Sequence, residues 1–472
     1  MSQPPVTQPP TDDAALARVL QRIDTDLPAA LERLQALLRI PSISTDPAYR
    51  EPCARAAAWL RDDLAGLGFA ARIDQTPGHP MVVARAADGP GPHVLFYGHY
   101  DVQPVDPLDL WHRDPFDPAV EETPAGRVIR ARGAADDKGQ LMTFVEACRA
   151  WVAEHGALPI RVSILFEGEE ESGSPSLVPY LKEKAPDLRA DLAMICDTGM
   201  FDPETPAIST MLRGLLGQEV VITGPERDLH SGMYGGAAMN PARVLARILA
   251  DLHDDQGRIQ VPGFYDDVPE ISDDLRAQWE KLGFDAEAFL GAVGLKHPAG
   301  EAGRTALEQL WSRPTCEING MTAGYTGAGF KTVLPSRASA KVSFRLVGQQ
   351  DPATLRDAFQ DFVRARVPAD CKVEFINHSA GPASVMATDH PAFEAARQAL
   401  SDEWPREAAF IGCGGSIPIA GYFKTILGMD SLLIGFGRDD DQIHSPNEKY
   451  DLESFHKGTR SWARILAALA RA

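Results

Sequence analysis

The sequence predicts an α/β protein, a sheet with helices on its faces, interrupted by a smaller α+β domain. Apolar strands alternate with helical segments through residues 93–199, and the same style returns after about residue 386. The segment between them has its own order of strand, helix, strand, strand, helix, strand. A length of 472 residues also favours two domains over one.

The first domain is expected to begin with a helix. Helical periodicity starts after a Pro- and Gln-rich stretch, with Thr11 or Asp12 as the expected N-cap. The short apolar runs HVLFYG, IRVSILFEG and DLAMICDTG each predict a buried strand. A strand, a loop and a helix are expected, in that order, over RVIRARGAADDKGQLMTFVEACRAWVAEHG.

The inserted domain is expected to have strands at 215–224, 338–347 and 371–377, and helices at 240–254 and 351–367. Asp351 is the expected cap of the second helix. These elements lie between two parts of the first sheet. We therefore expect a first part of the main domain, an inserted domain and a second part, with boundaries at 1–211, 212–385 and 386–472.

Composition excludes several kinds of partner. A formal net charge of -20 repels phosphate backbones and anionic lipids, so nucleic acid and membrane are not expected partners, whereas cations are favoured. The six cysteines form no CxxC pair, which is typical of reduced thiols in a cytoplasmic protein. The first residues lack the basic and apolar regions of a signal peptide.

Clustered polar residues follow the predicted strands. GHYDV places His99 and Asp101 two residues apart, on one side of an extended chain. GAADDKGQ carries two acids, among them Asp136, in a loop that opens a helix. Taken alone, the first motif is more often structural, and the acids of the second equally fit a helix N-cap.

Three further motifs are equally ambiguous when each is taken alone. EGEEESGS contains the adjacent acids Glu170 and Glu171, which water alone would solvate in an ordinary acidic turn. Asp197 in CDTG ends an apolar strand, and His444 in IHSPNE is far away in the sequence. Together, two histidines and several acids at strand ends supply the N and O ligands that suit zinc, manganese or cobalt. Two such cations could share one carboxylate and activate a water molecule.

The order of these motifs resembles the M20 family of metallopeptidases. GHYDV, ADDKG, EGEEESGS, ICDTG, GCGGSIP and IHSPNE occur in the family's order. RDLHSGMYGG and GFKTVLPSRASAKVSFRLV resemble most closely the branch of cytosolic nonspecific dipeptidases and carnosinases. The resemblance covers residues from about 90 to 450. It implies a di-metal aminopeptidase-like catalytic domain with a mixed sheet, and a ferredoxin-like (βαββαβ) inserted domain that serves as lid and dimerisation domain.

The resemblance also implies roles for the residues of the first domain. His99, Asp136 and Asp197 would hold one divalent ion, and Asp136, Glu171 and His444 would hold the other, so that Asp136 bridges them. Glu170 would be the general base that activates the water between the metals, and Asp101 would orient His99. The ions would be zinc or manganese, with cobalt as a further option.

Substrate contacts are implied for the inserted domain and for the GCGGSIP segment. His230 would reach the active site of the other subunit of a homodimer, and Arg345 would bind the terminal carboxylate of the substrate. Substrate would also be contacted by Thr332, Gly415 and Ser416. Without the resemblance, His230 fits a loop cap and Arg345 fits an outward-facing strand residue.

The predicted function is therefore metal-dependent hydrolysis of the amide bond of dipeptides. An N-acyl-amino-acid amidohydrolase on the same fold is the alternative, because it would keep all the metal ligands and differ in the pocket for the amino-terminal part. A non-catalytic metal-binding protein is a further alternative, which the intact Glu170 argues against.

Overall fold

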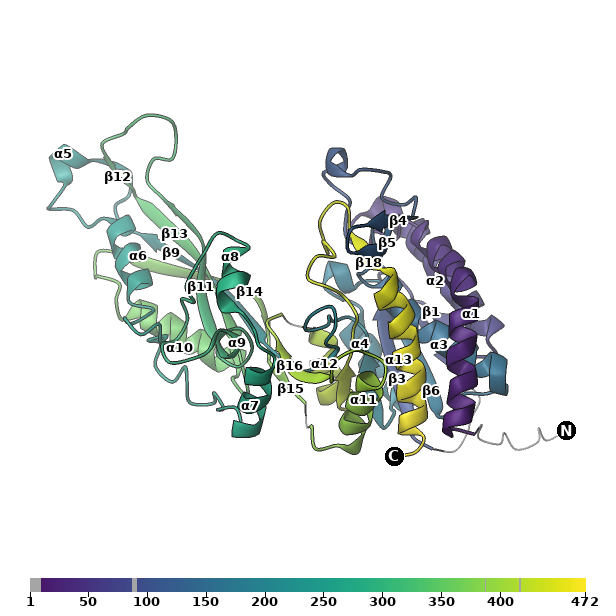
Figure 1. Cartoon of the computed structure of the whole chain (residues 1–472). Helices are drawn as coiled ribbons and strands as arrows, with labels where there is room; N and C mark the ends of the chain where they lie inside the picture. The colour runs from purple at the N-terminus through teal and green to yellow at the C-terminus, as the bar shows by residue number, and fades with distance from the viewer. Residues whose placement is uncertain (1–9, 87–90, 387, 416) are drawn as a thin grey trace. The chain divides into compact units, whose positions relative to one another are not determined.

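The computed structural model describes residues 10–86, 91–386, 388–415 and 417–472. The chain divides into two compact units (Figure 1). The first comprises Met1–Thr210, Met386–Phe410 and Tyr422–Ala472, and the second comprises Met211–Val385 and Ile411–Gly421. The prediction placed all of 386–472 in the main domain, whereas Ile411–Gly421 clusters with the second unit, because its strand and loop contact residues of that unit.

A mixed sheet forms the centre of the first unit. Its strands lie in the order β1-β2-β6-β3-β7-β17-β8. Two further strands pair with β8: β15, whose residues belong to the second unit, and β16, most of whose residues do. The pairs β3–β6, β3–β7 and β17–β7 are parallel, while β1–β2 and β2–β6 are antiparallel. The bounds are Ala70–Asp74 (β1), Met81–Arg85 (β2), His93–His99 (β3), Arg161–Glu167 (β6), Leu192–Ile195 (β7), Ala207–Leu212 (β8), Ser384–Val385 (β15), Ala409–Cys413 (β16) and Ser431–Leu433 (β17).

Three helices of this unit pack against one another: α1 (Asp13–Leu38), α3 (Lys138–His155) and α13 (Leu452–Leu469) (Figure 1). Asp12 is the N-cap of α1, because its Oδ1 accepts the N–H of Ala15 at 2.8 Å. Further elements are α2 (Arg50–Gly66) against β1 and β2, α4 (Leu177–Leu188), α11 (Pro391–Ser401) against α13, and a small sheet of β4 (Ala119–Thr123), β5 (Gly126–Arg130) and β18 (Lys449–Asp451).

The second unit contains a four-stranded antiparallel sheet in the order β11-β13-β9-β14. The strands are Gly214–Thr223 (β9), Thr315–Ala323 (β11), Arg337–Leu346 (β13) and Lys372–Gly381 (β14). Helices α6 (Pro241–Ala250) and α10 (Pro352–Arg364) pack on this sheet over a core that includes Val220, Leu245 and Phe344. The order β9, α6, β11, β13, α10, β14 is the predicted βαββαβ arrangement, and β11 is the strand for which no range was predicted.

Shorter elements complete the second unit. Two-residue strands β10 (Leu229–His230) and β12 (Val333–Leu334) pair beyond one end of the main sheet. The remaining helices are α5 (Ser231–Tyr234), α7 (Asp273–Lys281), α8 (Ala286–Gly291), α9 (Ala306–Trp311) and α12 (Pro418–Tyr422). In the described part of the chain, a helix with the length and apolar character needed to cross a membrane is not found.

Candidate metal centre

The polar motifs meet at one edge of the sheet in the first unit. His99 is the last residue of β3, a short turn at Glu170–Ser172 follows β6, and Asp197 follows β7. Because these three strands are parallel, their carboxyl ends lie at the same edge. Asp136 lies in the loop that precedes α3, and His444 lies in the loop that precedes β18.

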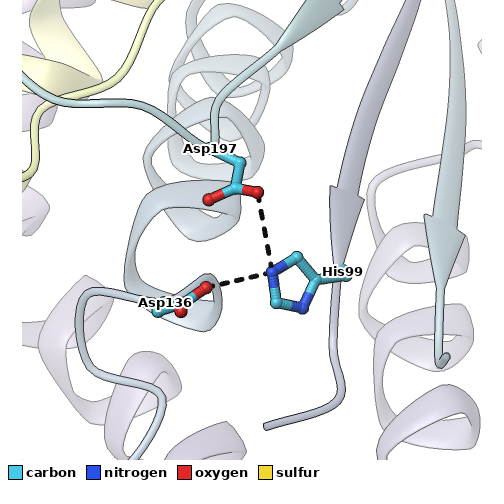
Figure 2. A group of neighbouring side chains, drawn as sticks. All are labelled: His99, Asp136 and Asp197. Atoms are coloured by element: carbon cyan, nitrogen blue, oxygen red, sulfur yellow. Dashed lines mark hydrogen bonds and ion pairs between the residues drawn. The ribbon is translucent and has the colours of Figure 1, made fainter. Parts of the chain in front are cut away.

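His99, Asp136 and Asp197 form a first group of possible metal ligands (Figure 2). Nε2 of His99 lies 3.1 Å from Oδ1 of Asp136 and 3.9 Å from Oδ2 of Asp197. The imidazole is fully buried, while the Asp197 side chain is 22% exposed. One nitrogen and two carboxylate oxygens thus converge on a small volume that is partly open to solvent.

Asp136, Glu171 and His444 form a second group. Nε2 of His444 lies 2.9 Å from Oδ2 of Asp136 and 3.3 Å from Oε2 of Glu171. Asp136 therefore turns one oxygen toward each group, which is the geometry required of a bridging carboxylate. The structure brings together all five residues that the resemblance assigned as metal ligands.

Asp101 connects His99 to the acidic turn. Its Oδ1 lies 3.4 Å from Nδ1 of His99, on the side of the ring opposite the ligand nitrogen. The same carboxylate accepts the backbone N–H groups of Glu170 and Glu171 at 3.2 and 3.0 Å, and the hydroxyl of Ser44 at 2.6 Å. One buried carboxylate therefore fixes both an imidazole ring and the backbone of two acids.

The charges at the site interact strongly. Burial opposes protonation of His99, but hydrogen bonds to Asp101 and Asp136 raise its pKa well above the usual value. Burial, together with the neighbouring Asp136 carboxylate, raises the pKa of Asp197 to about 8. Hydrogen bonds to Asp136 and Glu171 raise the pKa of His444 to about 10. Clustered carboxylates thus favour bound positive charge, whether it is supplied by protons or by metal.

The four acids of EGEEESGS have different environments. Glu167 is buried in β6, where its Oε2 accepts the Tyr97 hydroxyl at 2.7 Å, and burial raises its pKa to about 8. Glu169 is also buried and accepts the backbone N–H groups of His79 and Ser176 at 2.9 and 3.0 Å. The first two acids thus stabilise the local structure, while Glu170 and Glu171 remain at the metal groups.

Sequence reasoning missed the residues that hold the ligands in place. The buried Glu448 accepts backbone N–H groups of Gly133, Ala135 and Asp136, and it pairs with Arg132 at 2.8 Å. It therefore clamps the loop that carries the bridging Asp136. Glu448 ends the IHSPNE motif, so its proximity to His444 in the sequence was the available signal.

Two further supporting residues gave no signal in the sequence. Nε2 of Gln103 donates to Oε2 of Glu171 at 2.6 Å. Asp137, the second acid of GAADDKGQ, stands at the N-cap position of α3, but its carboxylate accepts the backbone N–H of His99 at 3.0 Å. Both contacts join segments that are distant in sequence.

The acidic cluster of Asp440, Asp441 and Asp451 provides an internal comparison. Nζ of Lys449 lies 2.6 to 2.9 Å from one oxygen of each of these acids. A lysine thus already supplies the positive charge at that cluster, and it needs no metal.

The residues predicted to contact substrate lie in the second unit. His230 and Thr332 are neighbours, because β10 pairs with β12 and the N–H of Ser231 donates to the Thr332 carbonyl at 3.1 Å. Arg345, near the end of β13, and Arg213 line a cavity of about 830 Å³. The carbonyl of Gly415 accepts the N–H of Arg213 at 3.2 Å, and Ser416 lies outside the described residues.

Residues 95–468 match the model of peptidase family M20/M25/M40. The chain belongs to this family. The match covers most of the sequence, including all five residues of the two ligand groups. The resemblance inferred from the order of the motifs is therefore confirmed.

Curated relatives match along nearly the whole chain. A Cys-Gly metallodipeptidase DUG1 of Candida albicans is 32% identical over 458 residues, which are 92% of this chain and 93% of the relative. A Beta-Ala-His dipeptidase of Homo sapiens is 29% identical, with 98% of this chain and 95% of the relative covered.

Solved structures of family members share the fold. An M20 family metallo-carboxypeptidase, Sso-CP2 from Sulfolobus solfataricus, has a TM-score of 0.81 at 31% identity, covering 94% of this chain and 99% of the other. The dipeptidase Dug1p from Saccharomyces cerevisiae has a TM-score of 0.78 at 29% identity, covering 97% and 99%. The predicted fold class, a mixed-sheet catalytic domain with an inserted α+β domain, is confirmed.

Proposed function

We propose that this protein is a metal-dependent dipeptidase that releases the C-terminal residue of its substrate. The observation that carries the proposal is the pair of ligand groups that share Asp136. The relatives named as Cys-Gly and Beta-Ala-His dipeptidases support dipeptides over N-acyl amino acids as the substrate class.

The residues of the site fit two divalent ions. Imidazole and carboxylate donors without thiolates suit zinc or manganese, with cobalt as a further option. Oε1 of Glu171 is buried and lacks a hydrogen-bond partner among the described residues, as expected of an oxygen reserved for metal. When bound, the ions would polarise the scissile carbonyl and lower the pKa of water.

Glu170 is the proposed general base, and it would pass the proton on to the leaving amine. Burial raises the pKa of its carboxyl, and the neighbouring acids Glu171 and Asp101 raise it further while His99 opposes them. A carboxylate with a raised pKa accepts a proton more readily than an ordinary surface glutamate does. Asp101 is the proposed positioning residue, since it holds the backbone N–H groups of Glu170 and Glu171.

Arg345 is proposed to bind the terminal carboxylate of the dipeptide through the planar fork of its guanidinium. Gly415 and Ser416 are proposed to contact the same substrate. Two observations support this placement. Arg345 and Arg213 line the same cavity, and the backbone N–H of Arg213 donates to the carbonyl of Gly415.

We propose that His230 acts in the active site of a partner subunit, together with Thr332. His230 lies beyond the Arg337 end of β13, and Arg345 lies near the other end. Eight residue steps of strand separate Arg337 from Arg345, or about 26 Å. An extended dipeptide spans about 7 Å, so a substrate held by Arg345 cannot reach His230 of the same chain. Nδ1 of His230 accepts the N–H of Gly232, which leaves Nε2 as a donor for a developing oxyanion.

A homodimer in the cytoplasm completes the proposal, with the second unit as lid and dimerisation domain. All six cysteines are free thiols, which supports a reducing compartment.

A cleavage screen by mass spectrometry tests the function. The protein is stripped of metal, reloaded separately with zinc and manganese, and offered dipeptides, including β-alanyl-histidine, beside N-acetyl and longer N-acyl amino acids. The proposal expects cleavage of free-amine dipeptides and none by the metal-free protein. Preference for N-acyl substrates would overturn the dipeptidase assignment and keep the metal chemistry.

Complementation tests the dimer. His230→Ala and Glu170→Gln chains are each expected to be impaired alone, and mixing them should restore one working site per dimer. A mixture no more active than its components would contradict the contribution of His230 in trans.

A further inference from the structure

Basic side chains gather at the end of the sheet opposite the metal groups. A cavity of about 200 Å³ within the first unit is lined by Arg85, Ala86, His93, Arg161, Val162 and Arg189. Three arginines and a histidine around one small cavity stand out in a chain whose net charge is -20.

Strand register places these groups on one face of the sheet. His93 of β3 pairs with Arg161 of β6, and Arg85 of β2 pairs with Ser163 of β6. Alternate residues of a strand lie on the same face of a sheet, so Arg161 and Ser163 share a face. Residues directly opposite each other on neighbouring strands also share a face, so His93 and Arg85 lie there too. The hydrogen bond of 2.8 Å between Nε2 of His93 and the Ser163 hydroxyl agrees with this arrangement. Arg189 joins them from the C-terminal end of α4.

Within the described part of the chain, the positive charge of this arginine pocket is only partly balanced. Nη2 of Arg85 donates to the Asp187 carbonyl at 2.8 Å, and Nε of Arg161 donates to the Gly91 carbonyl at 3.2 Å. These carbonyl acceptors carry no net charge. Among the described residues, the ion pair found for the three arginines is the one between Arg161 and Asp191, at 3.9 Å. Each guanidinium has five N–H donors, so donors remain for a ligand.

The arginine pocket is separate from the metal groups. His93 begins β3 and His99 ends it. Six residue steps of extended strand separate the two histidines, or about 20 Å. An anion held at the pocket would therefore contact none of the metal ligands.

We propose that the arginine pocket binds the phosphate group of a small molecule, or inorganic phosphate itself. Guanidinium groups bind phosphate oxygens through paired N–H donors, and several of them around one cavity match a dianion better than a monocarboxylate. The volume admits one small oxyanion and excludes a macromolecular chain from its interior. The proposal is independent of the dipeptidase function.

Calorimetric titration of the metal-loaded full chain with inorganic phosphate, at constant ionic strength, tests the proposal. The comparison is between wild type and the Arg161→Gln, Arg189→Gln double variant. Any phosphate that binds at the metal ions should bind with the same affinity and stoichiometry in both proteins. We expect the wild type to bind one additional phosphate, and the double variant to bind it at least about tenfold more weakly, which is the effect of losing charge-assisted hydrogen bonds. A phosphate monoester, glycerol phosphate, is titrated in parallel; tighter binding than inorganic phosphate would identify an organic source.

Arg127→Gln is the matched control, because Arg127 is an exposed arginine paired with Glu122 on the hairpin of β4 and β5. It should bind phosphate like the wild type. Thermal unfolding checks the fold, and phosphate should raise the melting temperature of the wild type more than that of the double variant. If the double variant does not fold, the wild type is compared with the single variant Arg189→Gln, because Arg189 is exposed. Identical phosphate isotherms for wild type and variant would overturn the proposal.

Discussion

The two units carry their predicted functional residues in contrasting ways. In the first unit, five candidate ligands from four loops and one strand end lie within two groups. His99 and Asp136 are buried, and further carboxylates and amides hold the groups in place. In the second unit, His230 and Thr332 lie beyond one end of a sheet and Arg345 lies near the other. All five candidate metal ligands thus lie in the first unit. In the second unit, His230 and Arg345 of one chain lie too far apart for a single dipeptide to contact both. Chemistry and substrate recognition should therefore respond to different variants.

Glu170→Gln should give the largest effect. The amide keeps the shape of the side chain but cannot accept the proton, so kcat should fall by about 10²–10⁴-fold while metal content is unchanged. Turnover is measured on a dipeptide and metal by elemental analysis. Glu122→Gln, on an exposed side chain, serves as the control. Wild-type turnover in Glu170→Gln would remove the residue from its proposed role.

Glu448→Gln should weaken metal binding without removing a ligand. One buried oxygen that accepts backbone N–H groups becomes an amide donor, so the loop of Asp136 loosens. Supporting residues of this kind are typically worth about 10- to 100-fold in metal affinity. Competition with a chelating dye measures that affinity. Unchanged affinity in a folded variant would show that the loop holds its shape without Glu448.

Arg345→Lys should change recognition and leave the metals in place. A point charge replaces a planar fork, so KM should rise by roughly 10- to 100-fold, with metal content as in the wild type. Arg337→Lys is the matched control, since Arg337 lies on the same strand and the same face, at the end distant from Arg345. A selective loss of metal in Arg345→Lys would contradict the assignment of metal binding to the first unit and of substrate recognition to the second.

Metal loading should release protons, which is the smallest effect expected here. Without metal, Asp197 has a pKa of about 8 and His444 one of about 10, so both hold a proton at pH 7. Because metal and protons compete, affinity should rise as pH rises from 6 to 8. Calorimetry in buffers of different ionisation enthalpy counts the released protons. A binding heat independent of the buffer would contradict this protonation state.

The contrast between the units also explains what the sequence could predict. The buried strands β3, β6 and β7, the Asp12 cap and the βαββαβ order follow from local patterns, and the ligands follow strand ends in a recognisable order. The contact between Glu448 and the loop of Asp136 spans 312 residues, and no local pattern specifies such a pair. Gln103 and Ser44 were missed for the same reason. The placement of Ile411–Gly421 in the second unit likewise depends on tertiary contacts, such as the one from Arg213 to Gly414.

The number of metal ions bound per chain tests whether the two ligand groups share Asp136. Wild type, Asp197→Ala, Glu171→Ala and Asp136→Ala are loaded with zinc, dialysed and measured by native mass spectrometry. We expect two ions per chain for the wild type, one for each of the two outer-ligand variants, and none for Asp136→Ala. Retention of two ions by folded Asp136→Ala would contradict a bridging role for Asp136.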